Sequence, residues 1–198
     1  MALEIERKFL VTGDAWRHEV SRSLDMRQGY LAGEGGLASV RVRLEGRAGN
    51  SECPVDIRSG ERPAMDGRAG GHSEAPKLRH GWQYEAYLNI KAAVIGAARA
   101  EYEYPLPVDE ARQLLATLCV GTLEKVRHYV ERDGLTWEID EFLGANAGLV
   151  VAEVELASID QAFARPPWLG RELTDERRYY NHHLAIHPYA TWPDADRN

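Results

Sequence analysis

The chain has 198 residues, of which 44% are hydrophobic and 28% are charged, and its formal net charge is −7. This length predicts a single domain over residues 1–198, and the apolar content is sufficient for a substantial core. The acidic balance argues against general affinity for nucleic acid or for an anionic membrane, because both require an excess of Lys and Arg. We expect neither as a partner.

The cysteine content and the first residues bear on the cellular compartment. The chain has two cysteines, Cys53 and Cys119, without CxxC spacing. This pattern excludes a disulfide framework and suits a reducing compartment. The first residues are charged, unlike a signal peptide, and no apolar run approaches the ~20 residues that span a bilayer. We therefore expect a cytoplasmic protein.

Short segments in which apolar and polar residues alternate follow one another along the chain, which is the pattern of half-buried strands. The Asp133-Gly134 pair predicts a tight hairpin between two of them, so the sheet is expected to be mostly antiparallel. Eight strands are predicted, over residues 3–10, 26–31, 38–44, 83–91, 98–104, 123–131, 134–140 and 149–156.

Helical patterns are fewer. Residues Val108 to Cys119 carry apolar side chains at the spacing of one helix face, with Asp109 as a capping residue. Shorter helices are expected over residues 14–20, 158–164 and 174–185, the second from a Ser158/Gln161 capping pattern. These helices would pack on the outside of the sheet.

Residues 45–80 interrupt the alternation. They are rich in Gly, Pro and charge and contain few large apolar side chains, which predicts a flexible insertion between two strands. Composition favours a solvated loop over a mobile lid.

In almost every predicted strand, the residues that alternate with the apolar ones are charged. Glu4, Glu6 and Lys8 share one face of the first strand, and Ile5 and Phe9 share the other. An open sheet with one face in water would explain any single strand. Across seven strands, however, like charges recur two residues apart, and such pairs repel unless an oppositely charged group lies between them.

The charged faces hold acids and bases in nearly equal numbers. If eight strands close into a barrel, these side chains enter its interior, where an unpaired charge costs several kcal/mol, so they must pair or bind ligands. Carboxylate pairs indicate a hard divalent cation, Mg²⁺ or Mn²⁺, and rows of Lys and Arg indicate phosphates. The acids are Glu4, Glu6, Glu101, Glu103, Glu138, Asp140, Glu153 and Glu155, and the bases are Lys8, Arg41, Arg43, Lys91, Arg99, Lys125 and Arg127.

Ordered motifs run through the chain outside residues 45–80. EIERKFLV at 4–11 contains an ExExK pattern, and it is followed by QGYL at 28–31, VRVR at 40–43, NIK at 89–91, EYEYP at 101–105, EKVR at 124–127 and AEVEL at 152–156. This set resembles the CYTH family, also called triphosphate tunnel metalloenzymes, and is most similar to its small bacterial inorganic triphosphatases. The resemblance implies an α+β fold built on an eight-stranded antiparallel closed β-barrel, with a charged lumen and helices packed outside.

The resemblance also implies roles for individual residues. The metal, Mg²⁺ or Mn²⁺, would be held by Glu4, Glu6, Glu153 and Glu155. Phosphoryl oxygens would be bound by Lys8, Arg41, Arg43, Lys91, Lys125 and Arg127. Lys8 and Tyr30 match a catalytic dyad, in which the ammonium would lower the pKa of the phenol. Water activated by the metal without a protein base is the competing account. The remaining acids, Glu101, Glu103, Glu138 and Asp140, are expected mainly to hold the basic side chains in place.

The sequence thus predicts a metal-dependent triphosphatase that converts inorganic triphosphate to pyrophosphate and phosphate. The alternatives are a class IV adenylate cyclase, a thiamine triphosphatase, or a module that binds polyphosphate or nucleotide without hydrolysis. The expected partner is a small-molecule triphosphate, and the chain could be a monomer or a homodimer. Its histidines lack zinc-ligand spacing, so no zinc site is predicted.

Overall fold

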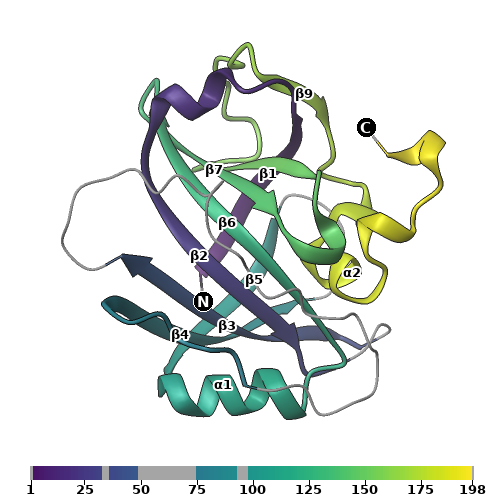
Figure 1. Ribbon diagram of the computed structural model, residues 1–198. Helices are drawn as coiled ribbons and strands as arrows, with labels where there is room; N and C mark the ends of the chain where they lie inside the picture. Colours follow the sequence, from purple (N-terminus) through teal and green to yellow (C-terminus); the bar gives the residue numbers. More distant parts are fainter. Residues whose placement is uncertain (1, 33–35, 49–74, 93–97, 198) are drawn as a thin grey trace.

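A curved, antiparallel sheet dominates the protein (Figure 1). The computed structural model describes residues 2–32, 36–48, 75–92 and 98–197. Nine strands follow the spatial order β5-β4-β3-β2-β6-β7-β8-β1-β9, with an additional pairing between β5 and β1. The strands are β1 (Ala2–Val11), β2 (Val20–Tyr30), β3 (Ala38–Ala48), β4 (Trp82–Ala92), β5 (Ala98–Leu106), β6 (Gly121–Arg132), β7 (Leu135–Phe142), β8 (Val150–Glu155) and β9 (Leu169–Glu172).

The predicted eight-stranded closed barrel is wrong. The sheet has a ninth strand, β9, which lies at one end of the strand order with β1 as its neighbour. Among the described residues, β5 pairs with β1 from Ala2 to Ile5, and β9 pairs with β1 further along, at Phe9 and Val11. One edge of β1 is therefore shared between β5 and β9. Because β5 occupies part of this edge, the sheet does not close along the whole length of β1. The sequence did not predict β9 because four residues are too few to show alternation.

The eight predicted strands are all present, and most extend beyond their predicted bounds. The hairpin between β6 and β7 is confirmed. Asp133 and Gly134 both adopt positive φ, 52° and 76°. This is the conformation of the two-residue turn whose twist matches antiparallel strands, and Asp-Gly adopts it readily.

The helices agree only in part with the prediction. Helix α1 (Val108–Thr117) is present, but its N-cap is Pro107, and Asp109 accepts a hydrogen bond from Arg112 at 3.0 Å instead of capping. The helix predicted over 158–164 is wrong, because the Gln161 Oε1 accepts from the backbone N–H of Ala157 in a turn. The short segments are 3₁₀ helices at Ala15–Glu19, Gly144–Asn146, Arg177–Tyr179, Tyr189–Thr191 and Asp194–Asp196, and helix α2 at Asn181–Ile186.

The outer face of the sheet is covered in two places. Helix α1 lies against β3 and β4, where Ala111 and Leu115 pack on Val42, Leu44 and Ala86 (Figure 1). A second apolar cluster covers the outer sides of β1, β6, β7 and β8 and includes the buried residues Phe9, Trp16, Val130, Trp137, Ile139, Ala152, Val154, Leu156 and Trp168. Both clusters match the apolar faces read from the alternation.

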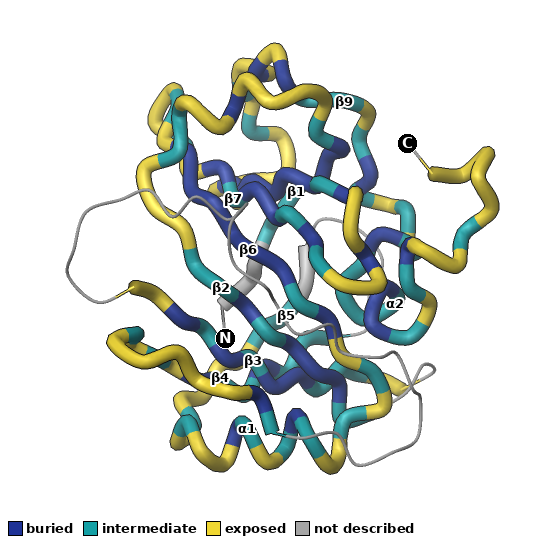
Figure 2. Tube along the Cα trace, in the orientation of Figure 1, coloured by how far each residue is buried: buried dark blue, intermediate teal, exposed yellow. Residues whose placement is uncertain are grey.

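The inner face is apolar at one end and charged along the rest. At the apolar end the strands contribute Leu10, Tyr30, Leu123, Phe142 and Val151, which pack against a C-terminal segment, defined here as residues 173–192. This segment contributes Leu173, Tyr179, Leu184, Ala185 and Tyr189 to the cluster. Its helix α2 lies beside β6; Leu184 and Ala185 of this helix are buried, and its other residues are partly buried (Figure 2). The C-terminal segment therefore covers one end of the inner face.

The predicted insertion begins later than expected. Residues 45–48 belong to β3, and residues 75–81 lead into β4. Residues 49–74 lie outside the described residues, so a flexible insertion there stays a prediction. Within the described ranges, no helix has the length and apolar character that crossing a membrane requires.

Candidate active site

The charged inner faces of the strands line a cavity of about 500 Å³. Strands β1 to β8 all contribute side chains to its wall, and the C-terminal segment contributes Tyr180, Asn181 and His182. Alternation alone places these side chains on one face, and the curvature of the sheet brings them together. The cavity brings together nine of the ten predicted site residues whose side chains the structure describes: Glu6, Lys8, Tyr30, Arg41, Arg43, Lys91, Arg127, Glu153 and Glu155.

Two predicted site residues are placed differently. Lys125 does not line the cavity: its side chain is completely buried and forms a short ion pair with Asp140. Glu4 lies on β1 with its backbone opposite Arg99 of β5, and its side chain lies outside what the structure describes.

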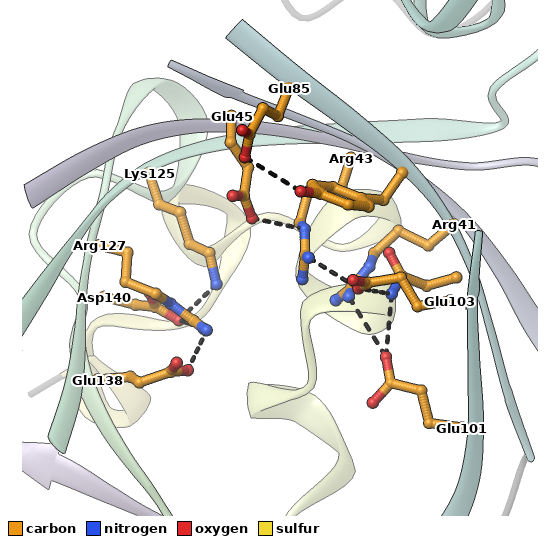
Figure 3. Close-up of polar contacts among 12 residues, drawn as sticks. Arg41, Arg43, Glu45, Glu85, Glu101, Glu103, Lys125, Arg127, Glu138 and Asp140 are labelled. Atoms are coloured by element: carbon orange, nitrogen blue, oxygen red, sulfur yellow. Dashed lines mark hydrogen bonds and ion pairs between the residues drawn. The ribbon is translucent and has the colours of Figure 1, made fainter. Parts of the chain in front are cut away.

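One wall of the cavity is an ion-pair network on β6, β7 and β8. Figure 3 shows its members on β6 and β7, Lys125, Arg127, Glu138 and Asp140. Asp140 accepts two hydrogen bonds from Arg127, both at 2.7 Å, and also pairs with Lys125. Arg127 further pairs with Glu138 and donates to Glu153 Oε2 at 2.7 Å. The forked guanidinium is suited to this arrangement, because its N–H groups point in fixed directions. Arg127 is therefore held rigidly, with its head at the cavity surface.

Glu153 joins this network to the signature lysine. Lys8 Nζ lies 2.7 Å from Glu153 Oε1, 3.5 Å from the backbone carbonyl of Tyr179, and 5.4 Å from the centre of the Tyr180 ring. Burial tends to raise the pKa of Glu153, but Lys8, Arg127 and Lys125 together outweigh it and hold that pKa well below its usual value. Glu153 is an anion shared by two cations.

For the ammonium of Lys125, burial outweighs the neighbouring carboxylates in setting the pKa. Burial and the neighbouring Arg127 lower its pKa to about 8, although Asp140 and Glu153 favour the charged form. The desolvation of a completely buried amine is the largest effect here. Its contact with Asp140 makes Lys125 a support for the wall.

The opposite wall consists of β3, β4 and β5, and its centre is Asn89. The Asn89 Nδ2 donates to Glu101 Oε1 at 3.0 Å and to Glu103 Oε2 at 2.6 Å. Lys91 lies 2.9 Å from Glu101, and Arg43 donates to Glu103 at 2.8 Å. The two carboxylates thus orient the cations of this wall, as Figure 3 shows for Arg41 and Arg43.

Several polar residues of the site were not predicted as site residues. Asn89 is completely buried and Gln28 is 1% exposed, and each has an amide oxygen without a hydrogen-bond partner. Alternation would have placed both on the charged face, but an uncharged side chain gave no electrostatic signal. Tyr180, Asn181 and His182 belong to the C-terminal segment, which no periodicity connects to the strands.

Two carboxylates of the cavity face each other across a pair of strands. Glu6 of β1 and Glu155 of β8 lie directly opposite each other in the register, and both line the cavity. Like charges in facing positions favour a cation between them. Among the described side chains, no group of three or more His, Cys, Asp and Glu forms a metal cage. Mg²⁺ commonly binds one or two carboxylates and completes its shell with water and phosphate oxygens, so this donor set fits it.

Comparison with known proteins shows the family. The CYTH domain matches residues 2–183. An inorganic triphosphatase of Acetivibrio thermocellus is 35% identical over 195 residues, which cover 98% of this chain and 100% of that protein. An inorganic triphosphatase of Nitrosomonas europaea is 32% identical over 187 residues, which cover 92% of this chain and 97% of that protein.

The fold agrees with this result. The crystal structure of an inorganic triphosphatase matches the chain with a TM-score of 0.56 and 29% sequence identity, covering 94% of this chain and 96% of that one. The protein belongs to the CYTH family.

Proposed function

We propose that this protein hydrolyses inorganic triphosphate to pyrophosphate and phosphate in the 500 Å³ cavity, with Mg²⁺ or Mn²⁺ as cofactor. The observation that carries the proposal is the convergence of five cations and an opposed carboxylate pair on one cavity. The cations are Lys8, Arg41, Arg43, Lys91 and Arg127. The similarity to two proteins named inorganic triphosphatase over nearly the whole chain supports the same substrate.

The cations bind phosphoryl oxygens. Arg41 and Arg43 offer forked donors that can contact two oxygens at once, and Lys8 and Lys91 add compact charges. Arg127 adds a charge and one N–H beyond those that contact Asp140, Glu138 and Glu153. The carboxylates on both walls already hold these cations in place, so little side-chain reorganisation accompanies binding. Such preorganised positive charge stabilises the charge that develops on the leaving pyrophosphate.

Glu6 and Glu155 hold the cation, together with Glu4 and Glu153 of the predicted ligand set. A bound divalent cation neutralises phosphate charge and lowers the pKa of a bound water. Glu153 also pairs with Lys8 and Arg127, so its oxygens would be shared between the cation and these two residues.

Lys8 and Tyr30 are the proposed catalytic dyad. Tyr30 is 3% exposed, lines the cavity, and packs its ring against His182 with 4.7 Å between the ring centres. Both residues line the cavity, and in the proposed dyad the Lys8 ammonium favours the phenolate that accepts a proton. Water that loses its proton without a protein base is the alternative, and Tyr30→Phe distinguishes the two through kcat.

The test is a phosphate-release assay with inorganic triphosphate, ATP and thiamine triphosphate, each with Mg²⁺, Mn²⁺ or a chelator. We expect turnover with either metal, the highest kcat/KM on inorganic triphosphate, and a reversible loss of turnover with the chelator.

Arg41→Gln should lower kcat/KM by about 100-fold, because it removes a charged contact to the substrate. Arg47→Gln is the matched control, since Arg47 lies on the same strand, is exposed, and does not line this cavity.

Other outcomes identify other functions. Cyclic AMP formed from ATP would indicate a cyclase, and preference for thiamine triphosphate would indicate a thiamine triphosphatase. Tight binding of polyphosphate without phosphate release would make the chain a binding module. Full turnover in the presence of chelator would refute the role of Glu6 and Glu155.

A further inference from the structure

The inner face of the sheet continues past the active-site cavity into a second, smaller cavity. This second cavity has a volume of about 150 Å³ and is lined by residues of β2, β3, β4 and β6. On β3, Arg41 and Arg43 line the active-site cavity. The next two side chains on the same face, Glu45 and Arg47, line the second one. The second cavity therefore lies further along β3, in the direction away from Tyr30 and the C-terminal segment.

Two carboxylates lie on the side of the second cavity that faces the active site. Glu45 and Glu85 are directly opposite each other in the pairing of β3 with β4, and both line the second cavity. Figure 3 shows them side by side, with Glu45 in contact with Arg43. Same-face residues of a strand are ~6.8 Å apart. Glu45 is therefore the first side chain on β3 that a ligand held by Arg43 meets when it extends beyond the active-site cavity.

The charge of these carboxylates is only partly neutralised. Arg43 lies 2.7 Å from Glu45, but the same guanidinium also donates to Glu103 at 2.8 Å. Glu85 accepts a hydrogen bond from the Tyr87 hydroxyl at 3.1 Å, and within the described ranges it forms no ion pair. One cation is thus shared by two acids next to Glu85, so this part of the inner face repels anions.

The cations of the second cavity lie beyond this pair. Arg22 stacks on the Tyr129 ring, with 3.5 Å between its guanidinium carbon and the ring centre, and Arg47 donates to Gln83 Oε1 at 2.9 Å. Both arginines are exposed, and water screens their attraction for an anion in the active site. A phosphate chain that extends from the active-site cavity along β3 meets Glu45 before it reaches either of them.

We propose that Glu45 and Glu85 restrict the substrate to chains of three phosphates, an inference that rests on the proposed function. The fourth phosphate of a longer polyphosphate that Arg41 and Arg43 hold lies against these carboxylates. Like charges brought together oppose binding, and partial burial strengthens the repulsion. The C-terminal segment covers the other end of the inner face, which opposes a shift of the chain in that direction. Tetraphosphate therefore binds more weakly than triphosphate, although it offers the cations more negative charge.

The test compares inorganic triphosphate with inorganic tetraphosphate, using kcat/KM from phosphate release and affinity from calorimetry without metal. The chain-length preference is defined here as the triphosphate value divided by the tetraphosphate value. The variants are Glu85→Gln, Glu85→Lys and Glu45→Gln, and the thermal midpoint of each shows whether it has folded. Glu131→Gln is the matched control, because Glu131 is an exposed carboxylate near the end of β6 and lines neither cavity.

We expect the wild type to prefer triphosphate by about 10-fold or more. Glu85→Gln should lower this preference by about threefold and Glu85→Lys by about 10-fold, because the charge is first removed and then reversed. In both variants kcat/KM on triphosphate should stay within about threefold of wild type, since Glu85 lies outside the active-site cavity. Glu131→Gln should leave the preference unchanged.

Equal values on the two substrates in the wild type would overturn the proposal, and so would a wild-type preference in both Glu85 variants. Glu45 is tested separately because it also contacts Arg43. If Glu45→Gln lowers kcat/KM equally on both substrates, Glu45 only orients Arg43, and its part in the proposal is rejected. A smaller chain-length preference in Glu45→Gln supports that part.

Failure of the two proposals can be told apart. A wild type that releases no phosphate from either substrate refutes the proposed function, and the ratio of the two calorimetric affinities then decides the chain-length limit by itself. An active wild type whose preference is unchanged in the Glu85 variants refutes the chain-length limit alone.

Discussion

Asp140 neutralises two buried cations at once. It is completely buried, accepts two hydrogen bonds at 2.7 Å from Arg127, and pairs with Lys125. Removing one partner of a buried ion pair lowers the stability of the fold by more than the intact pair contributes to it. The reason is that the remaining charges stay buried and still carry their desolvation cost. Asp140 is therefore the residue on which the β6–β7 wall of the cavity depends most.

We predict that Asp140→Ala lowers the free energy of unfolding by about 3–5 kcal/mol. Lys125→Met should cost less, about 1–2 kcal/mol, because Asp140 keeps both hydrogen bonds from Arg127. Urea unfolding measures both values. Asp109→Ala is the control: its carboxylate is exposed and pairs with Arg112, so a change within about 0.5 kcal/mol is expected. An Asp140→Ala variant as stable as this control would contradict the assignment.

A second, partly exposed interaction lies on the outer side of the same strands. Glu141 faces His128 at 3.4 Å and accepts two hydrogen bonds from Arg17, both at 2.9 Å. His128 and Arg17 together lower the pKa of Glu141 to about 2. The two well-formed Arg17 bonds are geometrically the better of these contacts. A carboxylate whose pKa falls on folding stabilises the native state only while it is ionised.

We predict that Glu141→Gln lowers the free energy of unfolding at pH 7 by about 1–2 kcal/mol, a value reduced for partial exposure. The unfolded carboxyl protonates near pH ~4.3 and the folded one near pH 2. The stabilisation is therefore complete above the first value and declines as pH falls toward the second. Unfolding at pH 7, 4 and 3 should show the difference between wild type and variant shrinking with acidification. A constant difference would exclude ionisation as the cause.

The positions of Lys91 and Lys125 could not be told apart from the sequence. Alternation placed Lys91 and Lys125 equally on the inner face, and both do lie there. Lys91 reaches the cavity beside Glu101, whereas Lys125 is withdrawn into the wall by Asp140. Lys91 lies directly across from Glu101, whereas Phe142 lies across from Lys125 and Asp140 lies across from the neighbouring Arg127. These relations depend on strand register, which periodicity does not contain.

At the scale of elements, the contact between β6 and α2 determines one end of the cavity. Gly121 begins β6, and a Cβ built on it would lie 2.5 Å from the carbonyl oxygen of Ala185 and 2.9 Å from its carbonyl carbon. Both atoms are backbone, so no side-chain rotation relieves the contact. Only glycine allows α2 to approach the strand this closely.

We predict that Gly121→Ala displaces α2 and lowers the free energy of unfolding by about 1–3 kcal/mol. It should also lower kcat/KM, because Tyr30 pairs with Gly121 across the sheet and packs on His182 of α2. Gly36→Ala is the control, since its nearest neighbour would lie 3.4 Å away. Calorimetry and the phosphate-release assay measure the two effects. Equal stability of both variants would contradict the close approach.

Element types were predictable where a period was long enough to see. The eight longer strands and α1 carry clear alternation or one-face spacing, and the Asp133-Gly134 turn carries its own conformational preference. The four-residue β9 and the six-residue α2 are shorter than a reliable period. The helix expected at 158–164 failed because Gln161 satisfies its side chain by closing a turn.

At the scale of the whole molecule, charge is distributed unevenly. The chain carries a net charge of −7, yet five cations and six carboxylates line the cavity. An anionic substrate is therefore attracted locally by positioned cations and not by the overall field, which is repulsive. The expectations of one domain, cytoplasmic residence, and a monomer or homodimer stay predictions at this scale.

The position of residues 173–192 along the chain has a consequence for biosynthesis. A ribosome makes every strand of the sheet before it makes this segment, which covers the apolar end of the inner face and supplies Tyr180, Asn181 and His182. Until translation has passed these codons, the nascent sheet exposes Tyr30, Leu123 and Phe142 to its surroundings. Binding competence therefore arises only after residues 173–192 have been made, and the chain that still lacks them is the form most in need of a chaperone.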